Sequence, residues 1–593
     1  MRENGIECYK NRKSALDIMT ILGIHDAHDA GAGIVRSGKV VGAVNEERFT
    51  KMKNDVGFPS HSVRYMREML DGDEEISKIA IPWIGGSALF ARIFPQLEVK
   101  RRKLWRREIA KPSRVSMSLR NIVFKTVQDQ KPSWFWNNTG RSIGTSLISN
   151  RLKRIGLDKK LVFIDHHTAH ASGGYYASGF KEALVLTLDG AGDGLSGSVS
   201  IGDNGELKRI KEFKASASLG ILYGAATIAC DMRYSEDEGK LMSLAAYSYP
   251  ENIKELGSIS RFDDKTGELV GNSGSKFEFL LAEYLKDNIL WKYNRESFAY
   301  AVQKHVEEEV LRMVRHYIKE TNIRNVVVSG GLFSNVIVNM KINAMPEVEN
   351  FFVFPQMGDG GLAIGAAYYV DFIENGKVER KQIDSISYGP SYTDTQIEET
   401  LKRHREKLEY EFTDDVAKYA ADKMIDDDEV VLWFQGRMEY GPRALGNRSI
   451  LSLAGNNENR HRINLLVKRR PYYQPFASSM LEEEAEKLLE PYRNGTKFMT
   501  IGYKVRDEYF KDLVAASHID GTTRPQMLGE ENREYRKLIQ HIKNRTGIGA
   551  VLNTSLNKHG RPIAMTPDDA VWTLLNTGAT TLAIGNYMVG KKK

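Results

Sequence analysis

The sequence predicts an α/β protein made of a duplicated unit and a second α/β domain. The duplication rests on two stretches, Ile21 to Val35 (ILGIHDAHDAGAGIV) and Leu184 to Ser200 (LVLTLDGAGDGLSGSVS). Each reads as an apolar strand, a turn rich in aspartate and glycine, and another strand. A third observation is the polar stretch from Glu374 to Asp394, whose glycines and proline predict a linker before a part of the chain with a different character.

The domain organisation follows from these patterns. Two equivalent strand–turn–strand units in one chain suggest a duplicated fold similar to that of actin and the sugar kinases. We expect an extension over residues 1–20, a duplicated domain over residues 21–378 with a basic insertion at about 95–155, a linker over 379–400 and a C-terminal domain over 401–593.

The composition is that of a globular protein. A chain of 593 residues is long enough for two or more domains. No run approaches the roughly eighteen apolar residues of a membrane span, and the N-terminus is too charged for a signal peptide. The two cysteines, Cys8 and Cys230, indicate a reducing compartment, so we expect a cytoplasmic location. They also exclude a cysteine-rich zinc site, so a metal here must use imidazole and carboxylate.

The positive charge is unevenly distributed. Residues Lys100 to Lys125 include ten Lys or Arg and one acid, Glu108, with Trp105, Trp134 and Trp136 in or just beyond the segment. A basic, aromatic segment can bind phosphates, anionic lipid or nucleic acid. The alternative is a solvated amphipathic helical insertion, and local charge does not identify a partner.

The stretch Ile164 to Phe180 (IDHHTAHASGGYYASGF) is the strongest candidate for a metal site. His166 and His170 are four residues apart, so on a helix they share one face, as two imidazole ligands require. Such a pair can equally be two hydrogen-bonded histidines, and a third ligand is needed to decide. Asp359 follows a predicted strand in FFVFPQMGDGGLAIG and supplies that carboxylate.

Other polar groups follow the predicted strands. His28 and Asp29 lie in the first turn, where open α/β sheets often carry sites. Glycine-rich turns such as Asp189 to Gly194 offer backbone N–H groups to phosphates. In the C-terminal part, arginines such as Arg443 lie in glycine- and proline-rich loops with few nearby acids, which suits them to capture phosphate or carboxylate. The alternative is a set of salt bridges between loops.

Together these residues resemble the O-carbamoyltransferase family that includes nodulation protein U and the cephalosporin and tobramycin carbamoyltransferases. The resemblance extends from about Ile21 to about Gly590 and covers nearly the whole chain apart from the extension and the basic insertion. The most specific of the matching runs is GRMEYGPRALGNRSI; the others are HDAGAGIV, EERFT, DHHTAHA, LTLDGAGDG, DEGKLMSLAAY, SGGLFSNVIVN, PQMGDGGLAIGAA, QPFASSM and LNTSLN.

The resemblance implies a two-step enzyme. An actin-like N-terminal domain, similar to the tRNA threonylcarbamoyl-transferase domain, would transfer a carbamoyl group to an acceptor hydroxyl of a sugar, glycan or small metabolite. A YrdC-like C-terminal domain would first convert carbamoyl phosphate and ATP, with Mg²⁺, to carbamoyladenylate. Adenylation supplies the leaving group that carbamate lacks, and converging cations stabilise the charge that develops.

The same resemblance assigns roles to residues. The metal would be iron(II), or another divalent ion, on His166, His170 and Asp359. The expected catalytic residues are His28 as general base, Asp29, Lys468 and Arg443. Nucleotide and phosphate contacts are expected from Asp189, Gly190, Gly192, Glu238, Lys240, Gly330, Gly331, Asn335, Asn339, Arg437, Arg448, His518, Arg524, Asn553, Ser555 and Asn557.

Two other functions stay open at this level. One is carbamoylation of a modified nucleic-acid base, or tRNA threonylcarbamoyl transfer, supported mainly by the segment Lys100 to Lys125. The other is a non-enzymatic actin-like scaffold that binds nucleotide and does not need the metal residues. The basic insertion lies where the family varies, so it is expected to shape acceptor choice. The acceptor itself and the oligomeric state, for which a homodimer is one option, are not determined.

Overall fold

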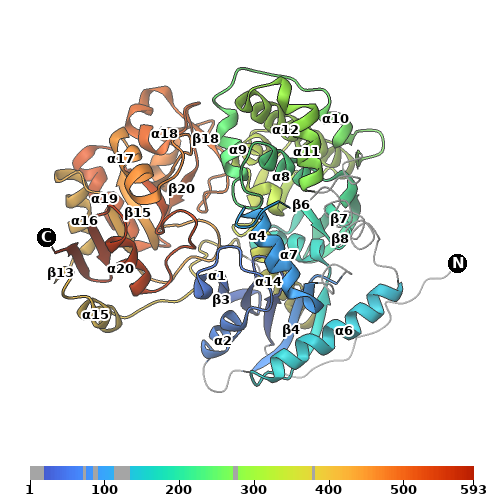
Figure 1. Ribbon diagram of the computed structural model, residues 1–593, viewed down its shortest axis with the longest axis horizontal. Coiled ribbons are helices and arrows are strands. Elements are labelled where there is room, and N and C mark those ends of the chain that lie inside the picture. Colours follow the sequence, from blue (N-terminus) through green and yellow to red (C-terminus); the bar gives the residue numbers. More distant parts are fainter. Residues whose placement is uncertain are drawn as a thin grey trace.

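The computed structural model describes residues 19–70, 75–84, 91–111, 134–271, 278–376 and 381–592, without the side chains of residues 134–141. The C-terminal part, in orange and red, lies beside a larger N-terminal part (Figure 1). Most of the N-terminal extension and residues 112–125 of the basic segment therefore lie outside the described residues. Within the described ranges, no helix combines the length and apolar character that crossing a membrane requires.

The first sheet of the N-terminal part is a five-stranded mixed sheet with the order β3-β2-β1-β4-β5. The first three strands form an antiparallel meander, and β4 and β5 run parallel to β1. The strands are β1 (Thr20–His25), β2 (Gly31–Arg36), β3 (Lys39–Asn45), β4 (Ile76–Pro82) and β5 (Lys160–Ile164).

The second sheet repeats this topology. Its order is β12-β11-β6-β7-β8, in which β6 to β8 form the meander and β11 and β12 run parallel to β6. The duplication predicted from the two strand–turn–strand units is therefore present. The strands are β6 (Glu182–Gly192), β7 (Leu195–Asp203), β8 (Glu206–Lys214), β11 (Asn325–Ser329) and β12 (Asn350–Val353).

Two helices lie between the sheets and position the site. α7 (His166–Ser178) packs on β6 and β11, and α14 (Leu362–Asn375) packs on β1, β2 and β4. The two helices approach closely, since a Cβ atom at Gly365 would lie 1.9 Å from the carbonyl oxygen of Ala169. This contact brings the N-terminal ends of both helices to one place.

Further helices surround these layers. Those of the N-terminal part are α1 (Glu47–Thr50), α2 (Ser60–Glu68), α4 (Pro95–Trp105), α6 (Trp134–Lys153), α8 (Leu219–Ala229), α9 (Glu238–Ala245), α10 (Leu256–Ile259), α11 (Phe279–Asn288), α12 (Arg295–Thr321) and α13 (Val336–Asn343). The short ribbon of β9 (Arg261–Asp263) and β10 (Glu268–Val270) completes this part. α12 lies against α9, and its apolar face is buried.

The C-terminal part is built on an eight-stranded sheet with the order β13-β23-β22-β14-β15-β21-β16-β20. Its strands are β13 (Leu408–Phe412), β14 (Val431–Phe434), β15 (Arg448–Leu453), β16 (Ala477–Leu481), β20 (Pro525–Leu528), β21 (Ala550–Ser555), β22 (Thr581–Ile584) and β23 (Tyr587–Lys591). Its longer helices are α15 (Asp394–Arg403), α16 (Val416–Asp426), α19 (Arg533–Thr546) and α20 (Pro567–Leu575), and a π-helix spans Ile463–Lys468.

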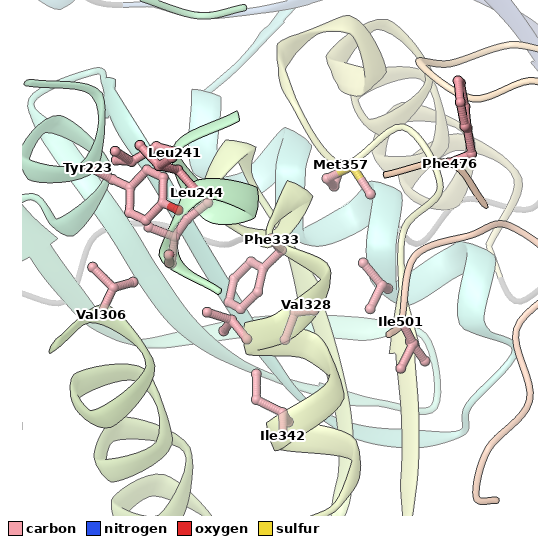
Figure 2. Packing of buried hydrophobic residues seen from close by; sticks show 14 of the residues in the cluster. Tyr223, Leu241, Leu244, Val306, Val328, Phe333, Ile342, Met357, Phe476 and Ile501 are labelled. Carbon is pink, nitrogen blue, oxygen red and sulfur yellow. The ribbon is translucent and has the colours of Figure 1, made fainter. Parts of the chain in front are cut away.

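One apolar core runs through both parts of the chain. Figure 2 shows Phe333 and Met357 of the N-terminal part in the same cluster as Phe476 and Ile501 of the C-terminal part. Backbone bonds reinforce this contact: the N–H of Gly502 donates to the carbonyl of Val336 over 3.0 Å. The predicted division at residues 379–400 is thus a division of the chain across which side chains pack continuously.

Candidate active site

Four donor side chains converge at the edge of the second sheet. His166 and His170 lie in the first turns of α7, Asp189 lies in β6, and Asp359 follows β12. One ligand atom from each lies within 4.8 Å of all the others. The Nε2 atom of His166 is 3.1 Å from Asp189 Oδ2, and Nε2 of His170 is 3.3 Å from Asp359 Oδ1.

The local sequence explains this convergence. The side chain of Asp165 caps α7 by accepting from the Thr168 N–H over 3.1 Å, which fixes where the helix begins. A Cβ atom at Gly192 would lie 2.2 Å from the ring of His166, so only glycine leaves room for this imidazole. The glycine-rich turn, predicted to cradle phosphates, thus also makes space for a metal-type ligand.

The donor set fits a divalent ion. The Nε2 atoms of His166 and His170 face each other at 3.1 Å, and the Nδ1 atom of His166 is buried with no hydrogen-bond partner. Two imidazoles and two carboxylates that point at one spot form a donor set that divalent first-row metals accept. The sequence predicted three of these residues as ligands and placed Asp189 among the nucleotide contacts. In the sequence, Asp189 and Asp359 both come after an apolar run and stand next to glycines, and that parallel was the available signal.

His28 lies directly beside this group. Its Nε2 atom is 3.1 Å from Asp359 Oδ2, and its Nδ1 atom is 3.3 Å from Asp29 Oδ2. Burial lowers the pKa of His28, but the charges of Asp359 and Asp29 outweigh burial and raise this pKa to about 9. The structure therefore brings the predicted base, its carboxylate partner and the donor group together.

The second glycine turn divides into two surroundings. Gly330 and Gly331 lie next to the donor group, where the Gly331 N–H donates to Asp189 Oδ1 over 3.1 Å. Asn335 instead caps α13 by accepting from two backbone N–H groups, and Asn339 donates to the carbonyl of Thr500 over 2.8 Å. These two amide side chains, expected at a nucleotide, are engaged in a helix cap and in the contact with the C-terminal part.

Glu238 and Lys240 lie at the start of α9. The Nζ atom of Lys240 pairs with Asp237 Oδ1 at 2.7 Å. Burial raises the pKa of Glu238 to about 7, because its carboxylate is held away from solvent. Gly190 lies in β6, with the Tyr234 hydroxyl at 3.8 Å from the position of a Cβ atom.

A second group, in the C-terminal part, is cationic. Arg443 and Arg524 are partly buried, their Nε atoms have no hydrogen-bond partner, and neither pairs with a described carboxylate. Burial lowers the pKa of Arg443 to about 10. Burial, together with the charges of Arg443 and Arg470, lowers the pKa of Arg524 well below its usual value. Cations gathered without anions form a site that favours a bound anion. Arg470 was not among the predicted contacts, although it lies in the same basic run as Lys468.

Lys468 extends this cationic group. It is 3% exposed, and its Nζ atom donates to Asn557 Oδ1 over 2.6 Å and to the hydroxyl of Ser555 over 3.1 Å. Burial, with the charges of Arg470 and Lys53, lowers the pKa of Lys468 well below 10.5. The predicted residues Lys468, Ser555 and Asn557 thus lie together.

Four other predicted contact residues make interactions within the chain. Arg448 is stacked on Phe434, 3.6 Å from its centroid, and its guanidinium donates to backbone carbonyls such as Pro390 O. Arg437 donates to the carbonyls of Tyr388 and Val41, which joins the first sheet to the C-terminal part. His518 packs against Tyr247 at 5.6 Å. Asn553 ties β21 to the loop that carries Arg443, through the carbonyl of Ala444.

Four basic residues in the described part of the basic segment pair with carboxylates of the chain. Arg101 pairs with Glu278, Arg106 with Glu236, Arg107 with Asp231 and Lys111 with Glu283. These charges hold α4 and the residues after it on the acidic surface near α9 and α11. Within residues 100–111, these four ion pairs connect the segment to the rest of the N-terminal part.

Comparison with known proteins identifies the class. The model of the carbamoyltransferase N-terminus matches residues 20–368, and that of the carbamoyltransferase C-terminus matches residues 422–591. The chain therefore belongs to the carbamoyltransferase family and is an enzyme of that class, as the sequence motifs predicted.

Several known proteins are similar to this chain. Nodulation protein NolNO of Sinorhizobium fredii is 31% identical over 95% of this chain and 79% of its own length. An uncharacterized protein of Methanocaldococcus jannaschii, MJ1058, is 34% identical over 80% of this chain and 79% of its own length. The 3'-hydroxymethylcephem-O-carbamoyltransferase of Streptomyces clavuligerus is 28% identical over 55% of this chain and 59% of its own. A solved structure of full-length HypF, in its phosphate- and nucleotide-bound form, covers 61% of this chain and 56% of its own, at 12% identity and a TM-score of 0.33.

Proposed function

We propose that this carbamoyltransferase joins carbamoyl phosphate and ATP into carbamoyladenylate and transfers the carbamoyl group to an acceptor hydroxyl of a sugar, glycan or other small metabolite. One observation carries the proposal. The chain holds an unpaired cationic group around Arg443 and Arg524 and, apart from it, a group of histidines and aspartates beside His28. The cationic group suits a step in which negative charge gathers, and the group of histidines and aspartates suits a step that needs a base and a metal.

The cationic group suits the activation step. Carbamoyl phosphate loses phosphate to water, and a carbamate oxygen then attacks the α-phosphorus of ATP while pyrophosphate leaves. Negative oxygens gather in this transition state, so Arg443, Arg524 and Lys468 would stabilise it by charge. By its family resemblance this domain would be YrdC-like, with Mg²⁺ on the ATP.

The second group suits the transfer step. The acceptor oxygen attacks the carbonyl carbon, AMP leaves, and His28 takes the hydroxyl proton while Asp29 orients its ring. His166, His170, Asp189 and Asp359 would hold the metal, which resemblance suggests is iron(II) and which supplies Lewis-acid stabilisation of anionic oxygens. The charge of Asp359 raises the pKa of His28. A metal ion held by Asp359 would offset that charge, so the pKa of His28 would fall toward the neutral range in which a base works best.

A product assay tests the proposal. Purified protein, reconstituted with iron(II), is incubated with carbamoyl phosphate, Mg²⁺-ATP and a mixture of alcohols. We expect AMP and pyrophosphate in equal amounts, together with alcohols heavier by one CONH unit in a mass spectrum. Release of ADP in place of AMP would contradict adenylate formation, and carbamoylated amines without carbamoylated alcohols would contradict the acceptor class.

A further inference from the structure

We infer that Trp105, at the end of α4, is the wall of the transfer site that selects the acceptor, and that Glu278 is the positioning residue that holds it there. The inference rests on the proposed function, because it assigns the acceptor side of the same site. It concerns a segment that lies outside the motifs shared with the family. Figure 1 shows α4 in the middle of the molecule.

Trp105 lies directly beside His28. Its indole ring lies 6.0 Å from the ring of His28 at an angle of 81°, and 4.9 Å from the ring of Tyr234. His28 contacts Asp359 of the donor group through Nε2, and Trp105 packs against the same imidazole. The side chain of His28 is 28% exposed, whereas Trp105 is 6% exposed. An alcohol that reaches His28 therefore meets the indole ring.

Glu278 holds the end of α4 in place. The two carboxylate oxygens of Glu278 bind two different residues: one accepts from Arg101, and the other accepts from the Trp105 Nε1–H over 3.2 Å. The guanidinium of Arg101 lies 4.4 Å from the centroid of the Trp105 ring. A side chain that packs against Arg101, His28 and Tyr234 and is hydrogen-bonded through its Nε1–H has one orientation, and such rigidity is what selective contacts need.

The groups around His28 indicate which alcohols the site suits. Aromatic rings form one side of the surroundings of His28: Trp105 and Tyr234 lie together, and Trp83 lies 6.2 Å from His166. The other side is polar and includes the Asp359 carboxylate and the Asp29 carboxylate, which is 33% exposed. A flat aromatic surface opposite hydrogen-bonding groups suits an alcohol borne on a ring better than a small acyclic alcohol.

Transfer selectivity provides the first test. The variants are Trp105→Ala, Trp105→Phe and Glu278→Gln, with Trp291→Ala as the matched control because Trp291 is 70% exposed. Each receives iron(II), carbamoyl phosphate, Mg²⁺-ATP and an equimolar mixture of myo-inositol, methyl α-D-glucopyranoside, glycerol and ethanol. We expect Trp105→Ala to lower the ratio of cyclic to acyclic products about tenfold, Trp105→Phe to lower it less, and Trp291→Ala to leave it unchanged.

Water is an acceptor that every preparation contains. If the parent protein carbamoylates none of the four alcohols, AMP release without alcohol becomes the measurement. We expect Trp105→Ala to raise this release about threefold, because the opened site admits water. Equal release and equal product ratios in the parent protein and in Trp105→Ala would overturn the inference.

A reactivity measurement separates this inference from the proposed function. Diethyl pyrocarbonate modifies accessible imidazoles in their unprotonated form, so the reaction is run at one alkaline pH for every variant, and peptide mass spectrometry reports the rate at His28. We expect modification of His28 to be about threefold faster in Trp105→Ala and in Glu278→Gln, because burial by α4 is reduced. If the parent protein makes no AMP while His28 is modified faster in the variants, the proposed function fails and the placement of Trp105 stands. Unchanged modification rates overturn that placement, whatever the activity.

Discussion

The Nε2 atom of His28 lies 3.1 Å from the Oδ2 atom of Asp359, and the other carboxylate oxygen of Asp359 faces His170. One carboxylate thus connects the proposed base to the proposed metal group. Any change at Asp359 alters both the proton affinity of His28 and the donor set. Variants at His28 or His170 are therefore the cleaner way to separate the two functions.

Replacement of His28 should separate transfer from activation. In His28→Ala, we expect AMP and pyrophosphate to form at a rate close to that of the parent protein, and carbamoylated alcohol to fall by about 10²–10⁴-fold. In Arg443→Ala, we expect pyrophosphate release itself to fall by about 10²-fold or more, because the developing charge loses a donor. Arg403→Ala, at an exposed arginine paired with Asp568, is the control. If both variants fail at pyrophosphate release, the division into two sites is wrong.

Metal affinity should depend on the donor group. We expect His170→Ala to weaken iron(II) binding by more than the roughly 10–100-fold that loss of an outer-shell partner causes, because a direct donor is removed. Binding is measured anaerobically by titration, with metal content after gel filtration as a second measurement. His461→Ala, at an exposed histidine of the C-terminal part, should bind iron(II) as the parent protein does. Equal affinity in His170→Ala would remove this residue from the donor group.

Lys468 should make stability depend on alkaline pH. Its pKa is lowered in the folded state, so between that lowered value and 10.5 the unfolded chain binds more protons than the folded one. The free energy of unfolding without substrate should therefore rise as pH rises through this window. Urea titrations at several pH values should show a smaller rise in Lys468→Met than in the parent protein or in Lys265→Met, where the lysine is exposed. Identical slopes in all three would contradict the buried, charge-destabilised lysine.

The close approach of α7 and α14 should tolerate no added methyl group. Gly365→Ala places a Cβ atom 1.9 Å from the carbonyl oxygen of Ala169, so helices or sheets must move. We expect a loss of about 1–3 kcal/mol in the free energy of unfolding, and weaker iron(II) binding, because α7 carries His166 and His170. Gly239→Ala, where no atom lies within 4 Å of the added carbon, should be neutral or stabilising in a thermal melt. Equal melting temperatures for both variants would contradict the tight contact.

Much of the fold and of the transfer site could be predicted from local patterns. The two strand–turn–strand units were visible because strands and glycine turns leave short-range signals, and His166 and His170 lie one helical turn apart. Asp359 could be added because a strand delivers its following turn to the sheet edge. The sequence could not distinguish a metal ligand at Asp189 from a residue of a phosphate-binding turn, because both occur in aspartate- and glycine-rich stretches. Only the folded structure shows that the His166 ring lies beside Asp189.

The remaining assignments depend on contacts between distant segments. Arg437 and Arg448 have the same kind of loop sequence as Arg443, but only the folded loop decides which guanidinium meets backbone carbonyls. The ion pairs of the basic segment could not be predicted, because its partners, such as Glu278 and Asp231, lie more than a hundred residues away in the sequence. Electrostatic partners of that kind leave no local pattern.

The apolar cluster that includes Phe333, Met357, Phe476 and Ile501 has a further consequence. Cutting the chain near residue 390 would expose apolar surface on both fragments, so neither fragment is suited to separate expression. Calorimetry of the intact protein should show a single cooperative transition, in which both candidate sites are lost at one temperature.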